Sequence, residues 1–272
     1  MSTVSVIVST YNQPQWLQKA LWGFRHQTHK TFELIIADDG SSEETTDLIT
    51  EFQKNSSLTI QHVWQEDKGF RKTRILNKAI VASTGEYLIF TDGDCIPRND
   101  LVARHLKHRK QQCFLSGGYF KLPLDISEAI TENDIETQRC FDVNWLVDVG
   151  LKKTFKTRKL NSYGLSEKLL NTFTPTKATW DGNNASGWRT DILDVNGFDE
   201  RMQYGGEDRE LGERLINNGI KPVQVRYSAI TLHLDHPRGY VTDDMLEKNK
   251  QIRKETKRQK RVWTSFGIKK ND

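Results

Sequence analysis

Two aspartates separated by a single glycine, Asp92-Gly93-Asp94, directly follow an apolar run of the chain. The glycine lets the backbone approach a ligand closely. Carboxylate oxygens are hard ligands that suit Mg²⁺ or Mn²⁺, and these ions in turn bridge the oxygens of a diphosphate. An acidic turn without a ligand is the simpler interpretation of the tripeptide alone. The apolar run before it and the Cys95-Ile96-Pro97 loop after it favour a metal site.

Two later groups of polar residues are candidates for the same site. Glu207 and Asp208 follow two glycines at the start of an expected helix. The helix N-terminus stabilises carboxylates there, and the same position holds a carboxylate at the edge of a cleft, as a general base requires. His233 and His236 follow a strand-like run over residues 223–232. Two nearby histidines downstream of paired aspartates are candidate metal ligands, although single histidines are usually structural or solvated.

Basic side chains surround the start of another expected helix. Lys68 and Arg71 flank Gly69-Phe70, and Arg74 and Asn77 follow on the helix. A solvated basic helix face is the default interpretation. Basic groups at a helix start beside the edge of a sheet are also suited to bind phosphate.

These candidates need a scaffold that brings them together. Short β-branched runs alternate with amphipathic helical patterns. We expect strands over residues 4–9, 33–37, 58–63 and 87–91, and helices over residues 15–25, 43–53, 71–82 and 208–217. A hydroxyl of Ser41 or Ser42 is expected to cap the second helix. The alternation predicts right-handed βαβ crossovers and a mainly parallel sheet.

Small or acidic residues follow three of the expected strands. In a parallel sheet, ligands collect at the carboxyl ends of the strands. We therefore expect these segments to form one site. The three segments are Ser9-Thr10-Tyr11-Asn12, Asp38-Asp39-Gly40-Ser41 and Asp92-Gly93-Asp94.

Bulk properties fit one large α/β domain. The 272 residues can bury a substantial core. No run approaches the roughly 18 apolar residues that span a bilayer, and the N-terminus resembles a first strand more than a signal peptide. Three scattered cysteines fit free thiols in a reducing compartment. We therefore expect a cytoplasmic protein.

The positive charge is concentrated at the C-terminus. The net charge is +4, but residues 245–272 contain ten Lys/Arg and three Asp/Glu, so the rest of the chain carries −3. Such a tail can bind anionic lipid or nucleic acid, or simply be solvated. Its apolar face is thin, so a solvated helix and a helix lying on the inner face of the cytoplasmic membrane are both consistent with the sequence.

Taken together, the motifs resemble family 2 glycosyltransferases of the GT-A fold, a Rossmann-like mainly parallel sheet flanked by helices. The resemblance covers residues 4 to about 237 apart from a central segment. Its later part resembles galactosyltransferases and chondroitin polymerases. The segments that carry it are residues 6–12, 35–41, 71–77, 85–87, 90–94, 197–200 and 205–211.

The resemblance implies a division of the chain. A GT-A domain is expected over residues 1–240, with a nucleotide-sugar-binding half over 1–121 and an acceptor and catalytic half over 177–240. Between them lies an inserted helical segment over 122–176, which matches no motif. A basic helical tail over 241–272 completes the chain.

The resemblance also assigns roles to individual residues. Asp208 matches the catalytic base, and Glu207 beside it is expected to hold the acceptor or the donor sugar. Asp94 and His233 match metal ligands for Mn²⁺ or Mg²⁺, with His236 as a rival for the second position. The nucleotide and its diphosphate are expected to contact Thr10, Asn12, Asp39, Arg71, Asn77, Asp92 and Asp94.

The expected activity is an inverting transfer of Gal, GalNAc, Glc or GlcNAc from a UDP-sugar to an oligosaccharide or lipid-linked sugar hydroxyl. The family suggests bacterial surface polysaccharide or lipopolysaccharide synthesis. A non-catalytic sugar- or nucleotide-binding relative is the alternative. A nucleic-acid-binding protein would explain the basic tail but not the acidic strand ends, so no nucleic acid partner is expected. A dehydrogenase would need a glycine-rich turn after the first strand, which this chain lacks.

Overall fold

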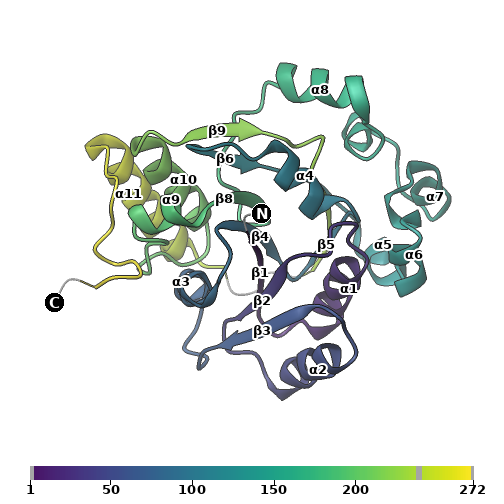
Figure 1. Ribbon diagram of the computed structural model, residues 1–272, viewed down its shortest axis with the longest axis horizontal. Coiled ribbons are helices and arrows are strands. Elements are labelled where there is room, and N and C mark those ends of the chain that lie inside the picture. Colours follow the sequence, from purple (N-terminus) through teal and green to yellow (C-terminus); the bar gives the residue numbers. More distant parts are fainter. Residues whose placement is uncertain (1–2, 237–240, 271–272) are drawn as a thin grey trace.

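A seven-stranded sheet forms the centre of the computed structural model, which describes residues 3–236 and 241–270 (Figure 1). The strand order is β3-β2-β1-β4-β8-β6-β9. Strands β1 to β4 are parallel, β8 is antiparallel to β4 and β6, and β9 is parallel to β6. The expected mainly parallel sheet is therefore confirmed. The strands are β1 (Val4–Thr10), β2 (Glu33–Asp38), β3 (Thr59–Trp64), β4 (Tyr87–Asp92), β6 (Cys113–Ser116), β8 (Asn184–Trp188) and β9 (Lys221–Gln224).

Helices cover both faces of this sheet because its strands are apolar on both sides. In β1, Val6 and Val8 face one helical layer, whereas Ile7 faces the other. Alternating side chains of one strand therefore fill two separate cores. The first layer contains α1 (Pro14–Arg25), α2 (Glu43–Lys54) and α4 (Leu101–His108), and the second contains α3 (Lys72–Ala82), α9 (Arg189–Asp194) and α10 (Glu207–Asn217).

A second, three-stranded sheet was not expected from the sequence. It consists of β5 (Cys95–Pro97), β10 (Ile230–His233) and β7 (Gly118–Lys121), in that order. Strand β10 is antiparallel to β5, with His233 opposite Cys95, and parallel to β7. This pairing brings the end of β10 next to the Asp94 loop.

The prediction of a single strand over residues 223–232 is wrong. The chain instead forms β9 and β10, which belong to different sheets. A turn separates them, in which the N–H groups of Ser228 and Ala229 donate to the carbonyl of Val225. The alternation of apolar and polar residues suggested one strand, but only β10 is fully buried, whereas β9 is exposed or half-buried along its length.

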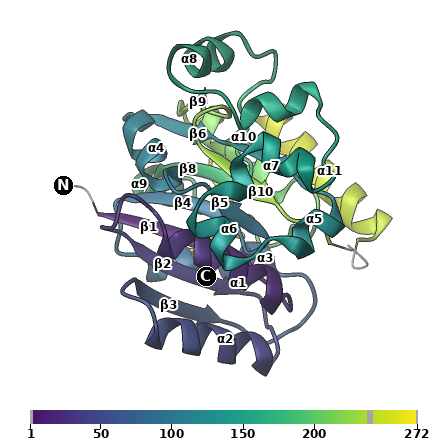
Figure 2. The same ribbon diagram turned by 90° about the vertical axis from the view of Figure 1, so that its right-hand side faces the viewer.

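The segment over residues 122–176 is a chain of short helices. Most of its apolar side chains form a third core against the second sheet, with Ile126 and Leu146 among its members. Its last helix, α8, stands apart from the other helices at one edge of the molecule (Figure 2). The helices are α5 (Leu124–Ala129), α6 (Glu132–Glu136), η1 (Arg139–Phe141), α7 (Val143–Asp148), η2 (Phe155–Lys159) and α8 (Gly164–Phe173).

The basic C-terminal residues pack against the body of the protein. Helix α11 (Asp243–Gln259) lies along α10 and buries Asn249, Ile252 and Thr256. Beyond it, Val262 and Ile268 pack against the core beside α3 and α9. Residues 237–240, which end the expected 1–240 domain, lie outside the described residues. Within the described ranges, the chain forms no helix with the length and apolar character to cross a bilayer.

Candidate active site

A cavity of about 790 Å³ lies at the carboxyl ends of β1 and β4. Its size is typical of sites for small molecules and cofactors. Asp94 and Asp208 both line it, although 113 positions separate them in sequence. The expected site residues that line it are Thr10, Asn12, Asp39, Asp92, Asp94, Glu207, Asp208 and His233. The structure does not bring Arg71 and Asn77 into this lining.

Asp92 ends β4 and is held from two sides. The hydroxyl of Ser9, its register partner in β1, donates to Asp92 Oδ1 at 2.6 Å. Lys72 Nζ lies 2.6 Å from the same oxygen. Burial would lower the pKa of Lys72, but the charges of Asp92, Glu207 and Asp208 raise it above its usual value. The sequence did not single out Lys72. It lies in the first turn of the helix after Gly69, next to the basic residues that were candidates for phosphate binding.

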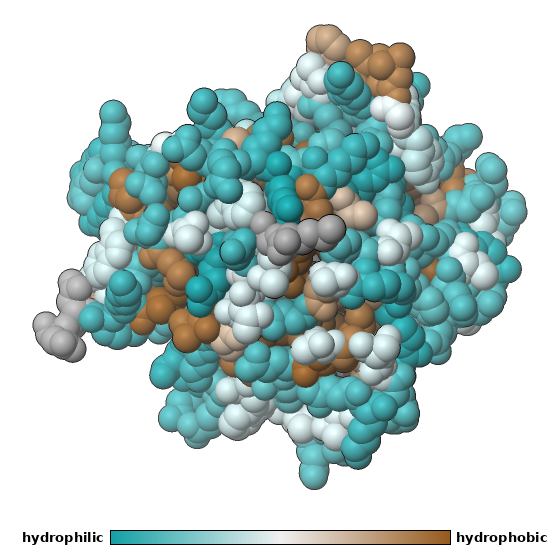
Figure 3. Space-filling model, viewed as in Figure 1, coloured by the Kyte–Doolittle hydropathy of each residue, from teal (hydrophilic) through white to brown (hydrophobic). Residues whose placement is uncertain are grey.

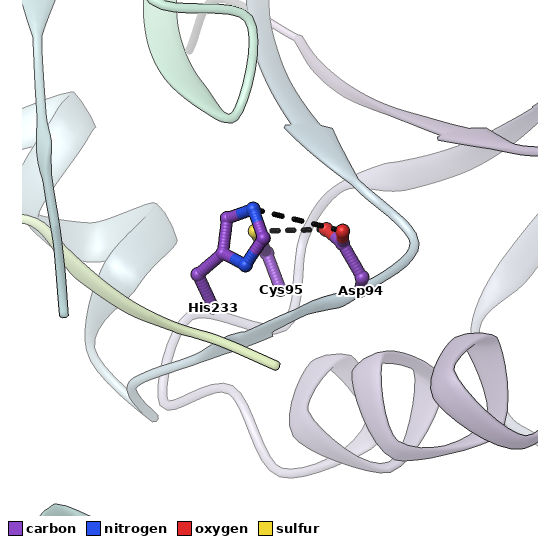
Figure 4. A group of neighbouring side chains, drawn as sticks. All are labelled: Asp94, Cys95 and His233. Carbon is purple, nitrogen blue, oxygen red and sulfur yellow. Dashed lines mark hydrogen bonds and ion pairs between the residues drawn. The ribbon is translucent and has the colours of Figure 1, made fainter. Parts of the chain in front are cut away.

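Two imidazoles converge on Asp94. His236 Nε2 lies 2.8 Å and His233 Nε2 lies 3.6 Å from Asp94 Oδ2. Figure 4 shows the ring of His233, from β10, turned toward the Asp94 carboxylate. Burial alone would raise the pKa of Asp94, but the hydrogen bond from His236 and the charges of both histidines outweigh it and lower the pKa to about 2. This carboxylate is therefore ionised at neutral pH.

The donor set around Asp94 fits a divalent transition metal such as Mn²⁺, since it combines one carboxylate with imidazole nitrogens. The two histidines differ in their outer hydrogen bonds. His233 Nδ1 donates to the carbonyl of Leu234 at 2.8 Å, which puts the lone pair on Nε2, the nitrogen that faces Asp94. Gln13 Nε2 lies 3.2 Å from His236 Nδ1, so His236 donates from Nε2 in this arrangement. When its ring is neutral, His233 is therefore in the tautomer that can bind a metal through Nε2.

Cys95 lies beside these candidate metal ligands, although the spacing of the cysteines did not predict a metal site. Its thiol donates to Asp94 Oδ1 at 3.3 Å, and Asp94, Cys95 and His233 bring their ligand atoms within 4.8 Å of one another. Burial, together with the charges of Asp94 and Asp92, raises the pKa of Cys95 well above its usual value. Without a bound metal, the sulfur is therefore a neutral thiol.

Glu207 and Asp208 begin α10 after a tight turn. Gly205 and Gly206 have φ values of 108° and 88°, a region that favours glycine. Glu207 is buried and accepts the Gly205 N–H at 2.8 Å. Burial and the charge of Asp208 raise the pKa of Glu207 to about 7. The turn therefore holds one carboxylate inside the wall and the next one at the cavity.

Two backbone N–H groups fix Asp208, and one of them comes from a distant segment. Its Oδ2 accepts the Gly182 N–H at 2.9 Å, and its Oδ1 accepts the Arg209 N–H at 2.7 Å. Asp181, beside Gly182, also lines the cavity. Burial and the charge of Asp208 raise the pKa of Asp181 to about 6. Three carboxyl groups from two segments thus meet on this wall.

The opposite end of the cavity contains the β1 and β2 loops. Asp39 is buried, and its two oxygens accept hydrogen bonds from Gln65 Nε2 at 2.6 Å and from the Arg71 N–H at 2.7 Å. Burial raises the pKa of Asp39 above its usual value. The Asn12 side chain accepts the Ser42 N–H at 2.7 Å. Asn12 thereby caps α2, whereas the serine hydroxyl expected in this role makes no capping bond.

Arg71 and Asn77 contribute to the surrounding structure. Arg71 supports Asp39 through its backbone, and its guanidinium donates to the carbonyl of Glu66. Asn77 is buried on α3, donates to the Phe198 carbonyl at 2.9 Å and accepts the Phe198 N–H at 2.8 Å. It therefore fixes the loop after α9. The sequence predicted Asn77 as a ligand-binding residue because a sequence does not distinguish a buried amide from one that faces a ligand.

Helix α11 forms part of the site, which the sequence did not indicate. Leu246 and Arg253 line the cavity. Asn249 is buried and donates to the carbonyls of Gln203, Tyr204 and Gly205, at 2.7, 3.1 and 3.2 Å. The C-terminal helix thus holds the turn that leads into Glu207 and Asp208.

Comparisons with known families match both halves of this site. The profile described as Glycosyl transferase family 2 matches residues 5–119, and that of the N-terminal domain of galactosyltransferase matches residues 176–237. Glycosyltransferase YfnE of Bacillus subtilis is 28% identical over 90% of this chain and 68% of its own length. Chondroitin synthase of Escherichia coli is 26% identical over 79% of this chain, which spans only 32% of that protein.

Solved structures share the fold. The mannosyltransferase PcManGT of Pyrobaculum calidifontis, in complex with GDP-Man and Mn²⁺, aligns with a TM-score of 0.60 and 20% identity, over 88% of this chain and 59% of its own. TarS 1-349 of S. aureus, in complex with UDP-GlcNAc, aligns with a TM-score of 0.61 and 17% identity, over 92% of this chain and 64% of its own. Residues 5–119 thus match the family 2 glycosyltransferases, residues 176–237 match the N-terminal domain of galactosyltransferase, and the chain has the GT-A fold.

Proposed function

We propose that this protein transfers a hexose or N-acetylhexosamine from a UDP-sugar to an acceptor sugar hydroxyl, with inversion at the anomeric carbon. One observation carries the proposal: Asp94 and Asp208 line the same cavity from opposite halves of the chain. A donor held at Asp94 would therefore present its sugar to an acceptor held at Asp208.

Asp208 is the proposed general base. Two backbone N–H groups, from Gly182 and Arg209, fix its carboxylate in the first turn of α10. A base must lie within hydrogen-bond reach of the acceptor hydroxyl, and Asp208 is exposed to the cavity where that hydroxyl would lie. Glu207, buried beside it, is proposed to bind a hydroxyl of the acceptor or of the donor sugar.

Asp94 and His233 are the proposed ligands of a Mn²⁺ or Mg²⁺ ion, and His236 is close enough to join them. When bound, such an ion offsets the negative charge that develops on the leaving diphosphate. Asp92 is proposed to bind near the ribose and the ion. Lys72, ion-paired to Asp92 across the cavity wall, adds a fixed positive charge to this acidic region.

The β1 and β2 loops are proposed to bind the nucleotide. Asp39 would contact the uracil, with Thr10 and Asn12 lining the same end of the cavity. UDP-GlcNAc in the TarS complex supports a UDP-sugar, while GDP-Man in the PcManGT complex shows that a protein of this fold binds a different nucleotide. Arg71 would act through its backbone bond to Asp39.

The proposed division follows from these roles. Residues 1–121 would bind the donor, 177–240 would supply the acceptor and catalytic side, and 122–176 would shape acceptor choice. Chondroitin synthase and hyaluronan synthase are among the curated relatives, so the proposed acceptor is an oligosaccharide or a lipid-linked sugar. A role in bacterial surface polysaccharide or lipopolysaccharide synthesis would supply such acceptors.

A donor screen tests the proposal. Purified protein with Mn²⁺ would be incubated with UDP-Gal, UDP-GalNAc, UDP-Glc, UDP-GlcNAc and GDP-Man, and nucleotide release would be measured against Asp208→Asn. UDP release from one UDP-sugar that falls in Asp208→Asn supports the proposal. Release only from GDP-Man would refute the nucleotide assignment. Tight UDP binding without release or transfer for any donor and a panel of oligosaccharide acceptors would instead identify a non-catalytic relative.

A further inference from the structure

Helix α8 has its polar and apolar faces reversed. A surface helix normally turns its apolar stripe toward the core. In α8 the only buried side chain is that of Glu167, whereas Leu165 and Phe173 are 73% and 77% exposed. Leu169 lies between them at a spacing of four residues, so the three form one stripe on the outer face.

Polar bonds hold the inner face of α8 in place. Glu167 accepts from Arg104 Nη1 at 3.1 Å and from the hydroxyl of Ser228. Asn171, one turn further, accepts the Tyr227 N–H at 3.0 Å and donates to Ser228 Oγ at 2.8 Å. The outward direction of the apolar stripe is therefore fixed by the fold and does not result from a loosely placed helix.

The segment that leads to α8 contains further exposed aromatic side chains. Phe155 on η2 and Tyr163 just before α8 are also exposed. Figure 3 shows hydrophobic atoms gathered over α8 at the edge of the molecule. We call this surface, formed by residues 152–177, the α8 platform. Contiguous exposed apolar surface of this kind marks an interaction site in a soluble protein.

The α8 platform is also strongly basic. Residues 152–177 contain seven Lys/Arg and one Asp/Glu, and the one acid is the buried Glu167. The platform thus carries +6, while the whole chain carries only +4. The exposed basic side chains are Lys152, Lys153, Lys156, Arg158, Lys168 and Lys177. Large apolar side chains among cations suit an anionic lipid surface, which offers both acyl chains and phosphate groups.

We propose that the α8 platform docks on an anionic membrane, with Leu165, Leu169 and Phe173 inserted at the level of the headgroups. The platform is attached to the cavity wall, because Lys159 Nζ donates at 3.0 Å to the carbonyl of Tyr119, a residue that lines the cavity. Docking would therefore hold the protein on the membrane that carries a lipid-anchored acceptor. The binding itself does not depend on the proposed transfer reaction.

The basic α11 fits this role less well. Its apolar residue Ile252 is buried against the protein, and Leu246 lines the cavity. Its positive charge lacks an apolar stripe directed outward. Removal of the tail after residue 241 would also disturb the turn held by Asn249, so substitution of exposed charges is the cleaner comparison.

Vesicle sedimentation of the full chain tests the proposal. The probes are vesicles of phosphatidylcholine alone and of phosphatidylcholine with phosphatidylglycerol. Lys152→Gln/Lys153→Gln/Lys168→Gln removes three charges from the platform, and Lys248→Gln/Lys254→Gln/Arg258→Gln removes three from α11 as a matched control. A third variant, Leu165→Ser/Leu169→Ser/Phe173→Ser, removes the stripe and leaves Glu167 and Asn171 intact. Circular dichroism and thermal melting check that each variant folds.

Wild-type protein is expected to bind the anionic vesicles and to lose affinity with salt. Since each basic residue near the surface contributes about fivefold in partitioning, the platform charge variant is expected to bind on the order of a hundredfold more weakly. Loss of the stripe is expected to cost at least about tenfold, and the α11 control much less than the platform variant. Absence of wild-type binding, or equal loss in the α11 control, would overturn the proposal. So would a wild-type dimer that the stripe variant converts to a monomer without any vesicle binding, because the stripe would then contact a second copy of the chain.

Discussion

The ammonium of Lys72 lies 2.6 Å from a carboxylate oxygen of Asp92 and is close enough to Glu207 and Asp208 for their charges to raise its pKa. Lys72 and Asp92 belong to the part of the chain that matches Glycosyl transferase family 2. Glu207 and Asp208 belong to the part that matches the galactosyltransferase domain. One cation therefore links the expected donor side of the cavity to the expected acceptor side.

Lys72→Met should lower kcat by roughly 10- to 100-fold, because the paired carboxylates lose the charge that orients them. Lys78→Met, at an exposed position of the same helix, is the matched control and should leave kcat unchanged. Steady-state kinetics and a thermal melt of each variant make the comparison. Wild-type kcat in Lys72→Met would show that the ion pair serves only the fold.

Asp208→Asn should retain UDP binding but lose about 10²- to 10⁴-fold in turnover, because the amide cannot accept the acceptor's proton. The amide oxygen can keep the hydrogen bond from Gly182, and the exposed Arg209 N–H, which loses its acceptor, can turn to water, so the fold should be preserved. Asp194→Asn, an exposed acid on α9, serves as control. Calorimetry measures UDP affinity, and a transfer assay measures turnover. Equal turnover in wild type and Asp208→Asn would remove Asp208 as the base.

Asp94→Ala should abolish the increase in UDP affinity that Mn²⁺ produces in the wild type. His233→Ala should do the same, since its Nε2 lone pair faces Asp94. Calorimetry of UDP with and without Mn²⁺ measures the effect. Asp148→Ala is the control, because that residue is exposed on α7 and does not line the cavity. If Mn²⁺ still increased UDP affinity in His233→Ala but not in His236→Ala, His236 would be the metal ligand in place of His233.

Glu207 should make the protein less stable as the pH rises. Burial and Asp208 raise its pKa from 4.5 to about 7, so the folded protein binds this proton more tightly than the unfolded chain does. Its stabilising effect is complete below the usual pKa and is lost as the pH rises through about 7, by roughly 3 kcal/mol in the free energy of unfolding. Asp181 acts in the same direction.

Urea unfolding of metal-free protein between about pH 5 and pH 8 measures this dependence. Glu207→Gln, which imitates the protonated form, should flatten it, whereas Glu86→Gln at an exposed position should not. An unchanged slope in Glu207→Gln would mean that Glu207 is ionised throughout this range.

Asn249→Ala should lower kcat because it frees the turn that places Glu207 and Asp208. The loss of the hydrogen bonds to three half-buried carbonyls should also destabilise the fold by about 1–3 kcal/mol. Asn217→Ala is the matched control, since its amide joins α10 to Arg261 at 2.8 Å, away from the turn. Comparable destabilisation with a fall in kcat only for Asn249→Ala is the expected result. Equal falls in kcat would reduce Asn249 to a purely structural residue.

The sequence determined the strands of the parallel half to within one residue at each end. Their β-branched runs end where polar residues begin, and this change in composition marks the sheet edge. Motif order likewise determined the family. Both properties depend on neighbours in sequence, so they are readable without a structure.

Tertiary structure decided which residues meet. Asn12 caps α2 in place of Ser42, and Asn77 supports a loop outside the cavity. Lys72 lies inside a motif segment that did not single it out, and Asn249 acts on the site from a helix that showed no motif. The reversed face of α8 is also invisible in sequence, because an apolar stripe looks the same whether it faces the core or the solvent. Hydrogen bonds and burial between distant segments settle these questions, and the pairing of those segments exists only in the folded chain.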